Sequence, residues 1–176
     1  MITKIGPFEL GQPIDQLPQE DFQKLSEVSL SSWAAIAKRH PLSASRGQLK
    51  DVPEQSFINS SDIDKAYEIR GVPFMDLNWN GDIAVTENRI SAIMVTYQAG
   101  QYGEPTSKGD IESVFKRILA DFESRIGKAH THPFLSKLYI WYLSEGTVIL
   151  EQLSAWNIHE VGLIVKLNRK GLKVRM

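Results

Sequence analysis

Two blocks of strand-forming sequence, residues 72–97 and 138–167, are interrupted only by short turns. Asn80-Gly81 supplies the two positive φ angles of a tight hairpin, and Glu87-Asn88 and Glu145-Gly146 predict further turns. Strands joined by such short connections must pair antiparallel, because a parallel pair needs a long crossover. The chain is therefore built around an antiparallel sheet of about six or seven strands, predicted at residues 3–10, 72–79, 82–86, 89–97, 138–143, 147–153 and 161–167.

Helical sequence precedes each block of strands. Residues 108–126 repeat apolar side chains three and four positions apart, with a capping pattern at Ser107 and Asp110 and a glycine stop at Gly127. A second helical segment is predicted to begin at Pro18 and to end before the proline at residue 41, either as one helix or as two helices divided at the serine cluster 29–32, and a third, short helix is predicted near residues 61–66. This order predicts an α+β fold, with two or three helices packed on one side of the sheet.

The length and composition limit the class of protein. A chain of 176 residues is predicted to form a single domain, residues 1–176. It contains no cysteine, which excludes disulfides, thiolate nucleophiles and every cysteine-based metal site. The start of the chain lacks the apolar core of a signal peptide, and no apolar run reaches about 18 residues, so we expect a cytoplasmic protein without a membrane contact.

The segment "GKAHTHPF", residues 127–134, is the strongest candidate for chemistry because it holds His130 and His132. In an extended segment the two imidazoles point the same way, as a metal site or an acid–base pair for RNA cleavage would require. Zinc takes three or four protein ligands, and no spacing supplies the others. We therefore interpret the segment as a surface joint and predict no enzyme, catalytic residue, metal or cofactor. A small hydrolase or ribonuclease using this histidine pair is the alternative.

Charge is distributed unevenly along the chain. Residues 51–90 hold eight acidic and three basic side chains, although the net charge of the whole chain is −1. Acidic groups around an aromatic anchor suit a basic protein partner, because the charges steer the encounter and the aromatic ring is buried on contact. A solvated face with core aromatics explains the same residues. The predicted partner-binding residues, with Trp79 as anchor, are Asp62, Asp64, Glu68, Asp76, Trp79, Asp82 and Glu87.

The C-terminal residues are basic, with Lys166, Arg169, Lys170, Lys173 and Arg175 and no acid among the last sixteen positions. Such a run favours nucleic-acid binding when exposed aromatics alternate with the charges. No such alternation is present, and a solvated edge strand explains the lysines equally well. We therefore predict no direct contact with nucleic acid.

Several stretches of the chain resemble bacterial immunity proteins of contact-dependent growth inhibition and polymorphic-toxin systems. They are "IGPFELG", "NGDIAVTENRISAIMVTY", the helix ending "RIGKAH", and "LYIWYLSEGTVILEQL". The resemblance lies in the pattern over most of the chain and includes no diagnostic motif, so it assigns no individual residue.

This resemblance implies a protein that is not an enzyme. Such proteins bind the C-terminal toxin domain of a cognate effector in the cytosol and block its active site or its access to substrate. Many of those toxins are basic nucleases, which an acidic patch complements. We therefore expect a cognate toxin domain, a nuclease, as the partner, and a chain that is a monomer or a weak dimer. The toxin's identity and the face that binds it are not encoded in any motif.

Overall fold

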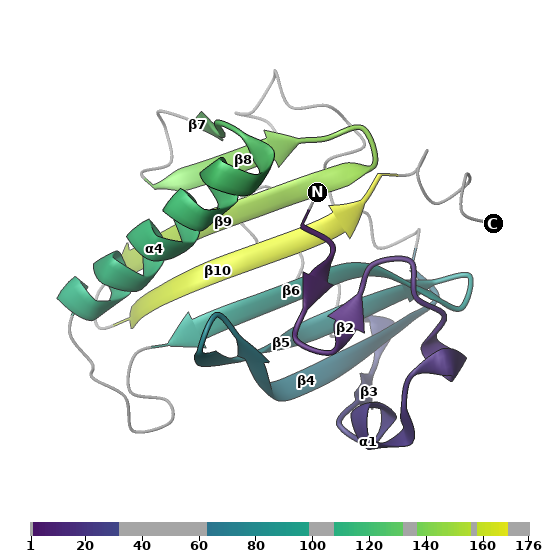
Figure 1. Ribbon diagram of the computed structural model, residues 1–176. Helices are drawn as coiled ribbons and strands as arrows, with labels where there is room; N and C mark the ends of the chain where they lie inside the picture. The colour runs from purple at the N-terminus through teal and green to yellow at the C-terminus, as the bar shows by residue number, and fades with distance from the viewer. Residues whose placement is uncertain (1, 32–62, 99–107, 132–136, 156–157, 169–176) are drawn as a thin grey trace.

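The computed structural model describes residues 2–31, 63–98, 108–131, 137–155 and 158–168. Within them, eight strands form one antiparallel sheet in the order β3-β4-β5-β6-β10-β9-β8-β7 (Figure 1). The predicted antiparallel sheet is confirmed, while the predicted count of six or seven strands is too low. The strands are β3 (Ser26–Val28), β4 (Lys65–Phe74), β5 (Leu77–Thr86), β6 (Arg89–Gln98), β7 (His130–Thr131), β8 (Leu138–Tyr142), β9 (Gly146–Ala155) and β10 (Ile158–Leu167).

The sheet consists of two meanders that meet where β6 pairs with β10. The apolar side chains on both faces of residues 89–97 predict a central strand, and β6 lies fourth of the eight, with Ile93 and Met94 buried on opposite faces. Nonpolar residues of this kind on consecutive positions are typical of a strand that is covered on both sides.

Helix α4 (Lys108–Ile126) lies where its periodicity predicts. Its apolar stripe, with Ile111, Phe115, Ile118 and Phe122, is buried against the sheet, chiefly on β9 and β10. Gly127 follows with a φ of +89°, the left-handed conformation that ends a helix at low cost in a glycine. Ser107, the predicted cap, lies outside the described residues.

The N-terminal segment differs from its prediction. The single strand predicted at residues 3–10 is a small hairpin of β1 (Lys4–Ile5) and β2 (Phe8–Glu9) that turns at Gly6. It is followed by the 3-10 helix η1 (Ile14–Gln16) and by α1 (Gln19–Phe22), which has only four residues and none buried. The long helix predicted from Pro18 is therefore wrong in the described region, because residues 26–28 pair with β4 instead.

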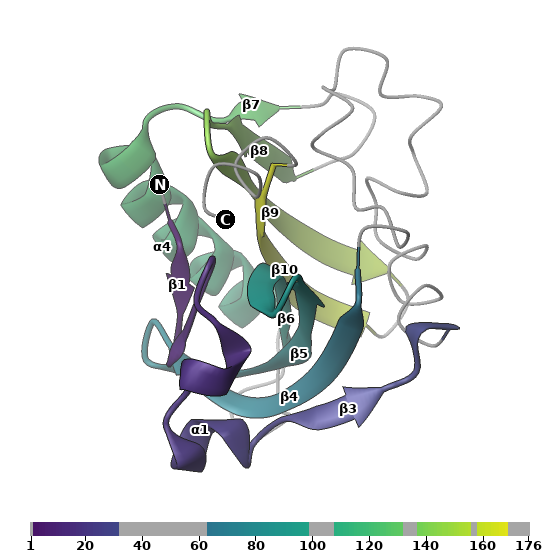
Figure 2. The same ribbon diagram turned by 90° about the vertical axis from the view of Figure 1, so that its right-hand side faces the viewer.

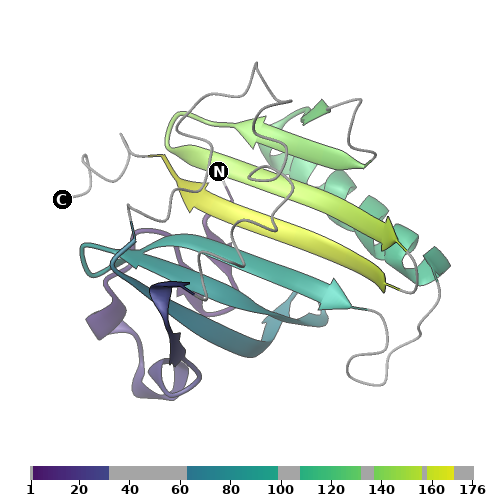
Figure 3. The same cartoon turned by 180° about the vertical axis from the view of Figure 1, so that it is seen from behind.

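Among the described residues, the elements outside the large sheet lie mainly on one of its two faces. Helix α4 and the β1–β2 hairpin cover the same face, side by side (Figures 1 and 2). The main core lies between them and the sheet, whereas a second, smaller apolar cluster that includes Met94, Ile149 and Ile164 lies on the other face. Seen from that face, α4 is behind the sheet (Figure 3). The prediction of two or three helices on one side is corrected, since α4 is the one described helix that packs its length on the sheet.

The β4–β5 hairpin turns five residues earlier than predicted. Met75 and Asp76, with φ of 52° and 62°, form the turn, while Asn80 and Gly81 lie inside β5. A Cβ on Gly81 would lie 1.8 Å from the backbone oxygen of Met94, so the glycine permits a close approach of β5 to β6. The other predicted turn, at Glu87 and Asn88, is confirmed by φ of 50° and 62°.

Candidate functional site

The predicted partner-binding residues lie at three levels along the β4–β5 hairpin. Asp76 is exposed at the turn, and Asp64 and Glu87 are exposed at the opposite end, where the Glu87 N–H donates to Asp64 Oδ2 at 2.6 Å. Between them Glu68 and Asp82 are directly opposite each other in the register of β4 and β5. Asp62 lies outside the described residues. The structure thus brings one pair of the predicted acids together in the middle of the hairpin.

Trp79 is not at the surface, and its predicted role as an exposed anchor is corrected. Its side chain is 0% exposed in the main core, and its Nε1–H donates to the Phe74 backbone oxygen at 2.9 Å. Its ring lies 6.0 Å from that of Phe74 and 5.8 Å from that of Tyr97. Because side chains alternate along a strand, Trp79 points to the face opposite Asp82.

Glu68 and Asp82 extend from the face of the sheet that α4 does not cover. Like charges directly opposite each other on neighbouring strands repel. Burial first, and the neighbouring Glu68 carboxylate second, raise the pKa of Asp82 to about 6. Arg70 relieves the repulsion only on one side, since its Nε–H donates to Glu68 Oε1.

A β-bulge shapes the surface around this pair. Arg70 and Gly71 of β4 together oppose the single residue Asn80 of β5, between the pairs formed by Ile69 and Val72. The Asn80 side chain repairs the interrupted ladder, because its Oδ1 accepts the Gly71 N–H at 2.9 Å. Asn80 is thus a fixed part of the site, although its sequence position predicts a turn.

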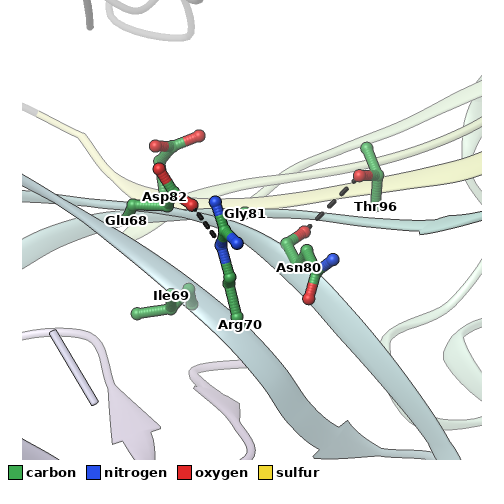
Figure 4. A pocket seen from close by; sticks show the side chains of 7 residues that line it. All are labelled: Glu68, Ile69, Arg70, Asn80, Gly81, Asp82 and Thr96. Carbon is green, nitrogen blue, oxygen red and sulfur yellow. Dashed lines mark hydrogen bonds and ion pairs between the residues drawn. The ribbon is translucent and has the colours of Figure 1, made fainter. Parts of the chain in front are cut away.

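An open pocket of about 400 Å³ lies over this bulge (Figure 4). We call it the bulge pocket, and its lining residues are Glu68, Ile69, Arg70, Asn80, Gly81, Asp82 and Thr96. The Thr96 hydroxyl of β6 donates to the Asn80 backbone oxygen at 3.4 Å. The polar rim of the bulge pocket therefore contains residues of three strands, β4, β5 and β6. Carboxylate, amide and hydroxyl oxygens in such a recess can accept several hydrogen bonds from a cationic group.

Two further carboxyl groups lie on the same face, beyond β6. Glu151 of β9 is only 7% exposed, and its carboxyl lies over Gly162 of β10, where an added Cβ would be 2.8 Å from Oε1. Burial first, and Glu160 second, raise the pKa of Glu151 to about 8. Glu160 accepts a hydrogen bond from Gln98 Nε2 at 2.9 Å. The sequence prediction missed this pair, although a glutamate within the apolar run "TVILEQL" is an available signal.

His130 lies at the sheet edge in β7, exposed, with its ring 5.1 Å from that of Tyr142. His132 lies outside the described residues. Among the residues that the structure describes, no three histidine, aspartate or glutamate side chains are grouped so that they could hold a metal ion. The hydrolase alternative stays a prediction.

The predicted basic tail is only partly described. Lys166 lies in the central strand β10 and is 6% exposed, so the interpretation of this residue as part of a solvated edge strand is wrong. The other four basic residues of that run lie outside the described ranges.

The described fold defines a sheet-rich chain in which one large antiparallel sheet is combined with few helices. No protein-family model, curated protein or solved structure matches it significantly. Within the described ranges, no helix is both long and apolar enough to cross a membrane.

Proposed function

We propose that this chain is a non-enzymatic immunity protein that binds and neutralises a cognate bacterial toxin domain in the cytoplasm. The observation that carries the proposal is the cross-strand pairing of Glu68 with Asp82 on the sheet face away from α4. The two carboxylates repel each other in the free protein. A cationic partner that binds beside them relieves this repulsion, and the relief favours binding.

The chemistry of the expected toxin supports this assignment. A nuclease binds a polyanion and therefore carries basic groups around its active site. An acidic surface that covers those groups excludes the nucleic acid by charge and by volume. Asp64, Asp76 and Glu87, exposed at the two ends of the same hairpin, extend the negative field over its length.

The mode of binding follows from the burial of Trp79. With that ring inside the core, charge pairs must contribute most of the specificity, and association is expected to be fast at low salt and to slow as salt screens the charges. The contact is expected to block access of the substrate without any chemical step by this chain.

The test is co-expression with the toxin domain encoded by the neighbouring gene. We expect the chain to restore growth and to copurify with the toxin domain. Reversal of the charge in Asp82→Lys should slow association strongly at low salt, whereas Asp15→Lys, an exposed acid on η1, should change it little. Unrestored growth together with no complex at micromolar concentration rejects the proposed function.

A further inference from the structure

The carboxylate of Asp82 is the least satisfied charged group of the bulge pocket. Among the described residues it accepts no hydrogen bond and pairs with no cation, while burial removes part of its hydration. A half-buried carboxylate has lost part of its hydration, and a cationic ligand that donates hydrogen bonds to it offsets that loss. The pocket of about 400 Å³ gives a ligand direct access to this group.

Arg70 shows which chemistry the pocket accepts. Its guanidinium is bonded to Glu68 beside Asp82 (Figure 4), yet the Arg70 side chain is 78% exposed and that of Glu68 is 38% exposed. An ion pair this open to solvent is weak and exchanges readily with an external cation. Arg70 therefore competes with an external cation for Glu68, and it does not itself pair with Asp82.

We infer that the bulge pocket binds the guanidinium group of an arginine side chain on the protein partner, held between Asp82 and Glu68 after Arg70 has turned away. This inference rests on the proposed function for its partner, and it adds the chemical group that the pocket recognises. A guanidinium presents several N–H donors in a rigid plane, which suits two carboxylates on adjacent strands better than the compact ammonium of lysine.

The binding should depend on pH in a defined direction. The charged groups that face Asp82 from β4 are Glu68 and Arg70, and on the β6 side its described neighbours Met94 and Thr96 are uncharged. Since the pKa of Asp82 is raised to about 6, protonation below that pH removes the negative charge that binds the guanidinium. Affinity should therefore fall by up to about tenfold between about pH 7.5 and about pH 5.

A small probe tests the pocket without the toxin. N-acetyl-arginine amide is titrated into the ¹⁵N-labelled full chain, with N-acetyl-citrulline amide as the neutral probe of the same shape. We expect saturable shifts of the backbone amides around Glu68, Gly81 and Asp82 with the arginine probe alone. Equal shifts with the citrulline probe, or shifts that are as large around Asp121 on α4, reject the pocket.

Matched variants assign the binding to the named groups. Asp82→Asn should weaken the arginine probe at least about tenfold, whereas Asp15→Asn should leave it unchanged. Arg70→Gln should strengthen binding about two- to fivefold because the competitor is gone. Arg125→Gln removes the similar exposed pair with Asp121 and should have no such effect. Unchanged affinity in both Asp82→Asn and Arg70→Gln overturns the inference.

The two proposals fail separately. A toxin domain that binds Asp82→Asn as tightly as the wild type rejects the arginine pocket and leaves the immunity function in place. Conversely, a chain that binds the arginine probe in the pocket but neither binds nor neutralises the toxin domain rejects the immunity function alone.

Discussion

Two pairs of carboxyl groups lie on the same face of the sheet, one on each side of β6, and their burial differs. Glu68 and Asp82 line an open pocket on β4 and β5, whereas Glu151 of β9 is covered and lies next to Glu160 of β10. In both pairs burial is the larger cause of the raised pKa and the neighbouring carboxylate the smaller.

The two sites therefore carry different charges at neutral pH. With a pKa of about 6, Asp82 is mostly ionised at pH 7 and available to a cation. With a pKa of about 8, Glu151 is mostly protonated and acts as a neutral hydrogen-bonding group. The sequence counts Asp82 and Glu151 alike as acidic residues. Only their different burial shows that Asp82 is available to bind a cation and that Glu151 is a structural group.

The largest expected effect is on the pH dependence of stability in Glu151→Gln. The folded-state pKa of Glu151 is raised above its unfolded value. The contribution of its protonated form to the free energy of unfolding is therefore complete below about pH 4.5 and is lost as the pH rises through about 8. Glutamine cannot ionise, and the variant should be more stable than the wild type at about pH 9 by up to about 5 kcal/mol. Urea unfolding at both ends of this range measures the difference. A difference that does not change with pH contradicts a buried, protonated Glu151.

The second comparison uses one glycine from each site. In Gly81→Ala the new Cβ meets backbone, 1.8 Å from the Met94 oxygen, and β5 must move away from β6. In Gly162→Ala the nearest atom is the end of the Glu151 side chain, which can rotate. We expect losses in the free energy of unfolding of about 3 kcal/mol or more for Gly81 and about 1 kcal/mol for Gly162. Equal losses in urea unfolding would mean that the carboxyl of Glu151 is held as rigidly as backbone.

A smaller effect of the same sign is expected for Asp82→Asn. The pKa of Asp82 is raised from 3.8 to about 6, so the wild type loses stability as pH rises through that range and the variant does not. Partial exposure screens the charge, and the gain at about pH 7.5 should be well below that of Glu151→Gln. Thermal unfolding at about pH 4 and about pH 7.5 measures it, with Asp15→Asn as the exposed control. A gain that is equal at both pH values rejects the raised pKa of Asp82.

Local sequence signals predicted the elements that local forces determine. Helix α4 follows from the three-and-four spacing of its apolar residues, and the antiparallel strands follow from short connections. The helix predicted from Pro18 was wrong because residues 26–28 form the edge strand β3, and pairing with β4 is a contact that local periodicity does not contain.

The candidate site was only half predictable for a related reason. A turn at Asn80-Gly81 would place Trp79 and Asp82 opposite each other on one face, as an aromatic anchor with a charge beside it. The turn at Met75-Asp76 instead pairs Asp82 with Glu68 and buries Trp79 on the other face. The choice between the turns depends on the bulge at Arg70 and Gly71 and on the contact of Gly81 with β6, both of which are set by tertiary packing.

The smallest expected effect on stability is that of Arg70→Gln. The Arg70–Glu68 ion pair is largely open to solvent, so its loss should change the free energy of unfolding by less than about 1 kcal/mol. Its electrostatic effect is more informative, because removing the cation strengthens the repulsion between Glu68 and Asp82 and should raise the pKa of Asp82 further. A ¹³C NMR titration of the Asp82 carboxyl in the wild type and the variant measures this shift, with Glu151 as the internal reference. An unchanged pKa of Asp82 in Arg70→Gln contradicts this prediction, whereas a shift in the pKa of Glu151 as well would show that the open pocket is coupled electrostatically to the buried site across β6.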